Sequence, residues 1–138
     1  MKVVVDTMLW VSYCTLADGH RHRLIERAKR RRVRFFVSEY IIQELVDTLT
    51  EDLGRSRRYA SLARRAVLRI AKLVKLPPTY RRHVPGDPDD DPIVQTALSA
   101  SAHYLVTADK EVLKLGKVRE IEVVTPAQFE ELLGPKEW

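Results

Sequence analysis

The sequence predicts an α/β fold: a central, mainly parallel sheet covered by helices on both faces, which makes three layers. The first observation is that short β-branched runs alternate with helical stretches along the chain. The second is that these runs are continuously apolar, as in strands that are buried on both sides. The third is size, because 138 residues, 45% of them hydrophobic, suit one globular domain over 1–138.

The first strands and helices are expected before residue 54. Residues 2–6 form a short apolar strand, and 34–38 form a second one that contains two phenylalanines. Helices are expected over 8–16 and 20–32, separated by a break at Ala17-Asp18-Gly19. Ser38 can cap a third helix, which Gly54 closes.

One long amphipathic helix is expected over 57–74, stopped by Pro77 and Pro78. A polar connection then runs from Leu76 to Asp91, and a helix begins at Pro92 and continues to about residue 102. The remaining elements are a strand at 104–107, a helical turn at 110–115, a strand at 120–124, and a last helix from a capping box at Thr125 to Leu133.

Charge and cysteine content narrow the class of protein. The net charge is +5, the sequence pI is about 9.5, and sixteen arginines outnumber eight lysines. This composition favours a polyanionic partner, although solubility alone would also account for it. With Cys14 alone, the chain cannot form an internal disulfide framework. We expect neither a signal peptide nor a membrane span, and therefore a cytoplasmic protein.

Carboxylates follow two of the expected strands. Asp6 and Asp109 each end a strand, and functional crevices in open α/β sheets lie at that edge. Glu44 lies within an otherwise apolar helix, and Asp87 and 89–91 precede another helix. Any one of these could simply cap a helix or form a turn. Together they predict an oxygen-ligated Mg²⁺ or Mn²⁺ site on a basic protein, which is the charge arrangement that a nuclease needs.

Four segments, in this order, resemble the PIN-domain family of metal-dependent ribonucleases, which includes the VapC-like toxins of toxin–antitoxin pairs. The resemblance spans nearly the whole chain. It is carried by Val3-Val4-Val5-Asp6-Thr7, Ser38 to Leu45, Asp87 to Leu98, and Tyr104 to Lys110.

The resemblance implies a PIN-like fold with four catalytic acids. They fall on Asp6, Glu44, Asp90 and Asp109, with Asp91 as the alternative third acid or an accessory residue. It implies that Mg²⁺ or Mn²⁺ is held by the three aspartates of this set and that hydroxyl groups orient the acids, here those of Thr7 and Thr107.

One position departs from the family pattern. The family often has Asn after the Asp-Thr pair, whereas this chain has Met8, which cannot hydrogen-bond an acid or a water molecule. We expect weakened rather than abolished cleavage. A PIN-like RNA-binding module that no longer cleaves is the alternative, and a DNA-cleaving flap-type nuclease is a smaller one.

The resemblance further implies RNA as the substrate, a cognate antitoxin as a partner, and a homodimer. Arg58, Arg65 and Arg69 on the long amphipathic helix are candidates for part of an RNA-binding surface, or else a solvated face. The helices around 8–16 and 38–53 are candidates for the dimer interface.

Overall fold

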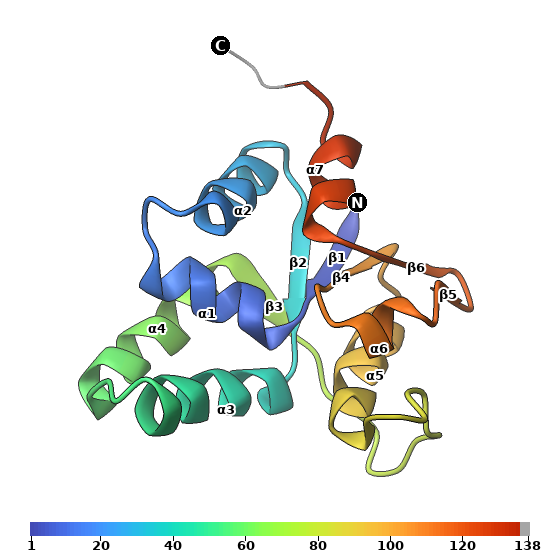
Figure 1. Ribbon diagram of the computed structural model, residues 1–138, viewed down its shortest axis with the longest axis horizontal. Helices are drawn as coiled ribbons and strands as arrows, with labels where there is room; N and C mark the ends of the chain where they lie inside the picture. Colours follow the sequence, from blue (N-terminus) through green and yellow to red (C-terminus); the bar gives the residue numbers. More distant parts are fainter. Residues whose placement is uncertain (136–138) are drawn as a thin grey trace.

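The computed structural model describes residues 1–135, which form one six-stranded sheet between helices (Figure 1). The strand order is β3-β2-β1-β4-β6-β5, and every pair is parallel except the short β5–β6 hairpin. This confirms the predicted α/β class. The strands are β1 (Lys2–Val5), β2 (Arg34–Val37), β3 (Ala71–Leu73), β4 (Tyr104–Val106), β5 (Lys117–Val118) and β6 (Ile121–Val124).

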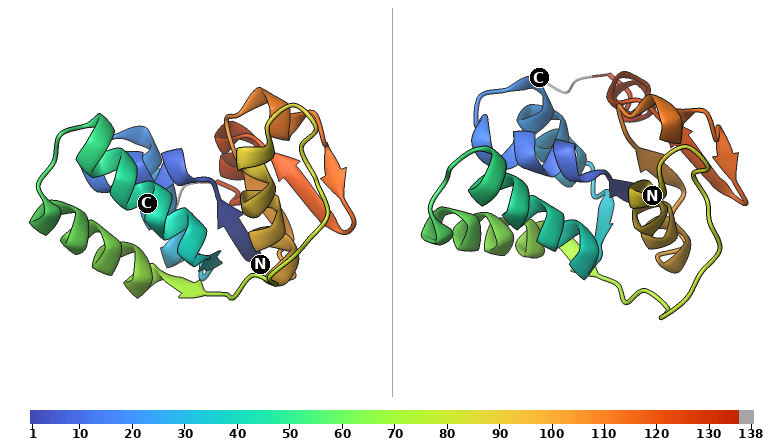
Figure 2. Two further views of the ribbon diagram at one scale, coloured as in Figure 1. Left: turned by 90° about the horizontal axis from the view of Figure 1, so that it is seen from below. Right: turned by 60° about the horizontal axis from the view of Figure 1, so that its bottom comes forward.

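The helices form two groups on either side of β1 (Figure 2). The helices α1 to α4 lie on one side, while α5 lies on the other and packs against β1, β2 and β4. The helical bounds are α1 (Thr7–Thr15), α2 (His20–Arg30), α3 (Glu39–Asp47), α4 (Arg57–Ile70), α5 (Asp91–Ser99), α6 (Lys110–Leu113) and α7 (Pro126–Leu132). Within the described residues, none of these helices has both the length and the apolar character that a membrane span requires.

The core is continuous through the sheet. The valines of β1 have no exposed surface, as expected for a central parallel strand covered on both faces. Trp10 on α1 is fully buried and meets Phe35 of β2 edge to face, with ring centroids 5.6 Å apart. This contact fixes the beginning of α1, and with it the end of β1, against the sheet.

The single helix expected over 57–74 was wrong at its C-terminal end. The helix α4 stops at Ile70, and 71–73 form strand β3 in parallel register with β2. Leu73 of this strand is 43% exposed. If the helix continued, the backbone groups at the free edge of β2 would stay unpaired. Strand β3 pairs with them instead, and beyond it the Val74 amide donates to the Val37 carbonyl at 2.8 Å.

Two smaller features were also absent from the sequence prediction. The third helix was expected to continue to Gly54, but after Asp47 the chain forms a π-helical turn, η1 (Thr48–Asp52). The two-residue strand β5 pairs with β6 in an antiparallel hairpin. The other expected elements are present, with ends that differ by a few residues.

The chain reverses its direction of travel across the sheet between β1 and β4. It first moves outward from β1 to β2 and β3, and then returns through α5 to β4 on the opposite side of β1. Adjacent parallel strands whose connections leave in opposite directions open a crevice at their carboxyl ends. The residues that follow β1 and β4 therefore face each other across this crevice.

The hydroxyl of Ser38 positions α3 beside the crevice. It accepts a hydrogen bond from the Ile41 amide at 3.4 Å and another from the Thr96 hydroxyl of α5 at 2.8 Å. Both Ser38 and Thr96 are fully buried. Ser56 makes the equivalent cap of α4 at an exposed position, where its hydroxyl accepts from the Tyr59 amide at 3.0 Å.

We expect Ser38→Ala to lower the free energy of unfolding by about 2 kcal/mol, because it removes a cap and a buried hydrogen bond with the Thr96 hydroxyl, which keeps the Pro92 carbonyl as its acceptor. The matched cap variant Ser56→Ala should cost about 1 kcal/mol, since water can replace the lost bond there. Urea unfolding followed by circular dichroism measures both. Equal losses would contradict the contribution of the Ser38–Thr96 hydrogen bond.

Candidate active site

A cleft of about 410 Å³ lies at the carboxyl ends of β1 and β4. Residues from five segments line it: the beginning of α1, the first turn of α2, α3 with η1, the start of α5, and the β4–α6 loop. The lining residues include all four acids expected from the sequence, Asp6, Glu44, Asp90 and Asp109, together with Thr7, Met8, Arg21 and Thr107. Acids that lie up to about a hundred residues apart in sequence thus share one concavity.

Asp6 is the most buried of these acids, with 8% exposure. It caps α1, because its Oδ1 accepts from the Leu9 amide at 3.2 Å, and its Oδ2 accepts from the Thr107 hydroxyl. Burial raises the pKa of Asp6, whereas the hydrogen bond from Thr107 acts to lower it. Thr107 also accepts from the Asp109 amide at 3.0 Å, so this single hydroxyl joins the ends of β1 and β4.

Glu44 projects from α3 toward the beginning of α1. Its Oε1 accepts a hydrogen bond from the Thr7 hydroxyl at 2.5 Å. Burial raises the pKa of Glu44, the bond from Thr7 acts in the opposite direction, and the charge of Asp6 raises it further. Thr7 therefore holds the Glu44 carboxylate in a fixed orientation at the cleft, beside the residue that follows Asp6.

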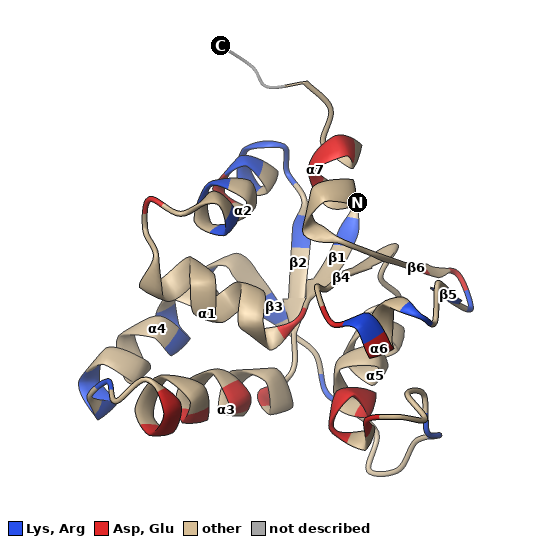
Figure 3. Cartoon of the chain, viewed as in Figure 1, with Lys and Arg blue, Asp and Glu red and all other residues tan. Residues whose placement is uncertain are grey.

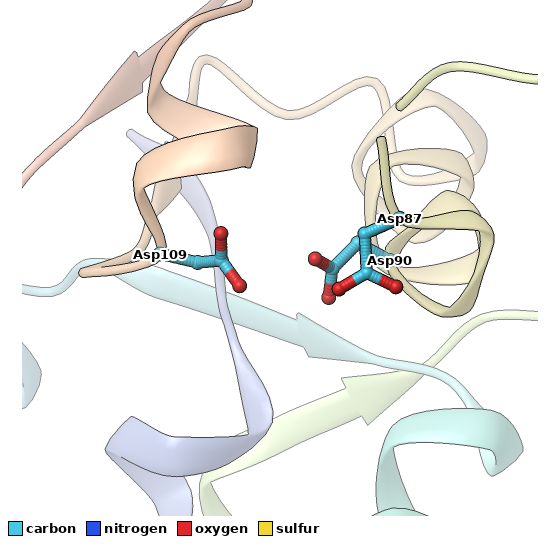
Figure 4. Close-up of side chains that lie close together, drawn as sticks. All are labelled: Asp87, Asp90 and Asp109. Atoms are coloured by element: carbon cyan, nitrogen blue, oxygen red, sulfur yellow. The ribbon is translucent and has the colours of Figure 1, made fainter. Parts of the chain in front are cut away.

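Three carboxylates converge on the other side of the cleft. Asp87, Asp90 and Asp109 each offer an oxygen atom, and these oxygens all lie within 4.8 Å of one another. Figure 4 shows the Asp109 carboxylate facing those of Asp87 and Asp90. Asp109 caps α6 through the Glu111 amide at 2.8 Å, while Asp87 accepts from the Asp89 amide at 3.1 Å.

Repulsion within this group is strongest at Asp90. Burial, together with the charges of Asp109 and Asp87, raises the pKa of Asp90 to about 8. Its Oδ2 is buried and has no hydrogen-bond partner among the described residues. An unpaired buried carboxylate oxygen between two further carboxylates requires a proton or a cation.

The donor set fits a hard divalent cation. Every candidate ligand is a carboxylate oxygen, the ligand type that Mg²⁺ and Mn²⁺ prefer, and neither a thiol nor an imidazole lines the cleft. Asp6, expected as a metal ligand, lines the same cleft but lies outside the group of three convergent oxygens. Asp87 stands in that group instead.

Asp91, the alternative third acid, has a different position. Its side chain is buried, and its Oδ1 accepts from the backbone amides of His83 and Val84 at 2.8 and 2.6 Å. These bonds hold the end of the long connection against the first turn of α5. Asp91 thus anchors the segment that presents Asp87 and Asp90, and it does not line the cleft.

Two residues that line or border the site were not singled out as site residues by sequence reasoning. Asp87 was one acid of a run in which any member could cap a helix, so its convergence with Asp109 required the tertiary structure. Arg21 belongs to a uniformly basic helix, yet it lines the cleft and its charge acts to lower the pKa of Asp6. Met8 lies at the cleft with 52% exposure.

The candidate RNA-binding arginines lie elsewhere. Arg58, Arg65 and Arg69 are exposed on α4, and none of them lines the cleft. Figure 3 shows acidic residues along α3 and at the start of α5, and basic residues on α2 and α4.

We expect Asp90→Asn to stabilise the metal-free protein, because it removes the carboxylate with the largest repulsion. A gain near 1 kcal/mol corresponds to a rise of about 3 °C in melting temperature for a chain of this size. Since the folded-state pKa of Asp90 is raised, the metal-free wild type should lose stability as pH rises from about 4 to about 8. The variant should lose less.

Thermal melts in EDTA across this pH range test the expectation. Asp89→Asn is the matched control, because Asp89 is exposed and its carboxylate lies outside the group of three. A melting temperature of Asp90→Asn at or below that of the wild type at pH 8 would refute the repulsion.

Comparisons with known proteins agree with this fold. A solved structure of PAE2754 from Pyrobaculum aerophilum is 19% identical and has a TM-score of 0.65, covering 99% of this chain and 91% of that one. A chain of VapBC2 from Rickettsia felis, solved bound to a DNA fragment from their promoter, is 12% identical with a TM-score of 0.64, covering 91% and 98%. At these identities the likeness concerns the fold.

A search of curated proteins found no match. The PIN domain family model matches residues 2–111, which include β1, the acids of the cleft and the beginning of α6. The match covers most of the chain and contains every residue of the convergent acidic group. The chain therefore belongs to the PIN domain family.

Proposed function

We propose that this protein is a metal-dependent endoribonuclease, the toxin of a toxin–antitoxin pair. The observation that carries the proposal is the convergence of Asp87, Asp90 and Asp109 at the crevice of a PIN domain. Carboxylates that serve only the stability of a fold are rarely gathered around an unpaired buried oxygen, because their repulsion destabilises the folded state. Catalytic sites for phosphodiesters use such a group to hold Mg²⁺ or Mn²⁺.

Asp90 and Asp109 would hold the ion, with Asp6 and Asp87 as further carboxylates around it. When bound, the ion supplies an activated water and neutralises charge on the phosphate. Thr107 keeps the Asp6 carboxylate in place, and the Asp109 cap of α6 keeps its other oxygen directed into the cleft. These bonds preorganise the acids, so that little reorganisation is needed when the substrate arrives.

Glu44 would serve as the group that orients the attacking water. It lines the same cleft as Asp90 and Asp109, and the Thr7 hydroxyl fixes its carboxylate. Burial raises the pKa of Glu44, which strengthens it as a proton acceptor at neutral pH. Arg21 is the cation among the lining residues and would contact a phosphate of the bound strand.

The toxin role is supported by the fold shared with VapBC2 from Rickettsia felis, which was solved bound to a DNA fragment from their promoter. From it we propose a protein antitoxin as the partner, a homodimer, and a cytoplasmic location. The prediction that Arg58, Arg65 and Arg69 contribute to RNA binding stays a prediction. The second candidate function is an RNA-binding PIN module without cleavage, which the exposed Met8 at the cleft favours.

We expect millimolar Mg²⁺ or Mn²⁺ to raise the melting temperature of the wild type, because an ion that binds only the folded state stabilises it. At a concentration 100 times Kd the gain is about 2.7 kcal/mol. Asp109→Asn should remove most of this gain, whereas Asp89→Asn should keep it. A wild type without a shift, and without heat in calorimetric titration, would exclude the metal site.

We expect Glu44→Gln to bind single-stranded RNA at least as tightly as the wild type while cleaving it at least about 100-fold more slowly, since it loses a negative charge and a proton acceptor. Asp6→Asn should also lose cleavage. Paired gel-shift and cleavage assays in Mg²⁺ and Mn²⁺ measure both properties.

Gln43→Glu is the control for this pair, because Gln43 is exposed on α3 outside the cleft and the change also alters one charge. It should cleave like the wild type. Cleavage by Asp6→Asn at the wild-type rate would assign the activity to a contaminant. Wild-type binding without cleavage in either metal would favour the RNA-binding module.

A further inference from the structure

A second cavity lies between α2 and α7, away from the acidic cleft. It has a volume of about 260 Å³, and within residues 1–135 its lining consists of four arginines, a histidine, one leucine and one acid: His20, Arg23, Leu24, Arg27, Arg30, Arg31 and Glu130. The basic residues recur at intervals of three and four along α2 and therefore share one helix face. A concave surface with several guanidinium groups and one carboxylate is a strong anion attractor.

Part of this positive charge holds α7 in place. Arg27 donates to the carbonyl of Gly134, and Arg31 donates to the carbonyls of Leu133 and Pro135. Cations at the carbonyl end of a helix are stabilising, so these two arginines have a structural role. The Nε of Arg27 is nonetheless buried without a hydrogen-bond partner among residues 1–135, in a side chain that is only 12% exposed.

Two other arginines have no such role. Arg23 and Arg30 are exposed at the cavity. Arg23 donates to the backbone carbonyl of Asp18, and neither residue forms an ion pair with a carboxylate within the described part of the chain. Guanidinium groups that line one cavity repel one another, and no carboxylate within residues 1–135 pairs with these two. An external anion would relieve this repulsion.

The cavity is joined to the acidic cleft by shared residues. Arg21 lines both the cleft and a hollow at the α1–α2 turn, and His20 lines both this hollow and the arginine cavity. The three concavities therefore follow one another around the first turn of α2. From Arg21 to Arg30 the helix rises by about 14 Å, which suits the backbone of an extended strand leaving the cleft.

We propose that the arginine cavity is a second phosphate site, which binds the backbone of the RNA strand beyond the cleft. This proposal rests on the proposed function, since it assigns the phosphates to the same substrate. The guanidinium fork matches phosphate oxygens bidentately, and contacts of this kind give affinity without reading sequence. The site extends the substrate that the protein holds and leaves the chemistry to the acids.

The test compares two double variants that each remove two positive charges. In Arg23→Gln with Arg30→Gln, the arginines that hold α7 stay intact, so the variant should remain folded, which a thermal melt checks. Lys117→Gln with Arg119→Gln is the control on the β5–β6 hairpin, at the edge of the sheet away from α2 (Figure 1). Affinity is measured in Mg²⁺ in a Glu44→Gln background, which is expected to bind RNA with little cleavage, for RNAs of about 4 and about 16 nucleotides.

The α2 variant should bind the longer RNA about tenfold more weakly than the wild type, and its slope of log affinity against log salt should fall by about 1.4, the value for two single-strand phosphate contacts. The shorter RNA, which is confined to the cleft, should bind the α2 variant as tightly as it binds the wild type. In Mg²⁺ the variant should show a higher KM for the longer RNA with an unchanged kcat. The hairpin variant should behave like the wild type throughout.

The outcomes separate the two proposals. Normal cleavage with unchanged affinity of the α2 variant would overturn the second phosphate site and leave the nuclease standing. RNA binding that depends on Arg23 and Arg30, in a protein that cleaves no RNA, would support the second phosphate site and overturn the nuclease. If the hairpin variant lost as much RNA affinity as the α2 variant, the effect would come from net charge alone, which would overturn the second phosphate site. Stabilisation of the wild type by inorganic phosphate, without any change in RNA affinity of the α2 variant, would assign the cavity to free phosphate and also overturn it.

Discussion

Mutual repulsion among carboxylates at the crevice between β1 and β4 is the constraint to which the rest of the site responds. The fold brings Asp6, Asp90 and Asp109 into one cleft with Asp87 and Glu44, and burial raises the pKa of several of them. Backbone and hydroxyl donors compensate part of this cost. The Leu9 amide and the Thr107 hydroxyl satisfy Asp6, while the first turn of α6 satisfies Asp109. No described residue donates a hydrogen bond to the buried Oδ2 of Asp90, so this oxygen is left for a proton or a cation.

The supporting interactions link the site to the core. Trp10 packs α1 onto β2, and Ser38 joins the beginning of α3 to α5 through Thr96. Asp91 ties the long connection to α5, so that the residues just before it reach the cleft. Buried hydrogen bonds thus tie Asp6, and through Asp91 the loop that carries Asp87 and Asp90, to the core, which is how a domain of this size can hold like charges together without losing its fold.

Acidic and basic residues lie in different parts of the molecule, and this separation would guide a polyanion toward the cleft of the proposed nuclease. The acids occupy the crevice, whereas the arginines of α2 line a cavity that continues from it around His20 and Arg21. A polyanion is attracted by the basic surface and meets the acids only where a cation can neutralise them. Met8 at the cleft mouth adds an apolar, exposed contact where the PIN-like pattern often has an amide.

The sequence by itself determined the α/β class and most element positions, and it placed Asp6 and Asp109 at one edge of the sheet, because strand ends and helix caps are local patterns with strong physical signatures. Glu44 and Asp90 were expected at the site from the resemblance to the PIN-domain family. The tertiary structure decided what depends on neighbours in space. The free edge of β2 converted 71–73 from helix to strand. Loop geometry directed Asp87 and Asp90 into the cleft and Asp91 into a buried backbone contact, although the three belong to one acidic run. Sequence spacing cannot make these distinctions, because they are set by which donors and charges lie within a few ångströms across the fold.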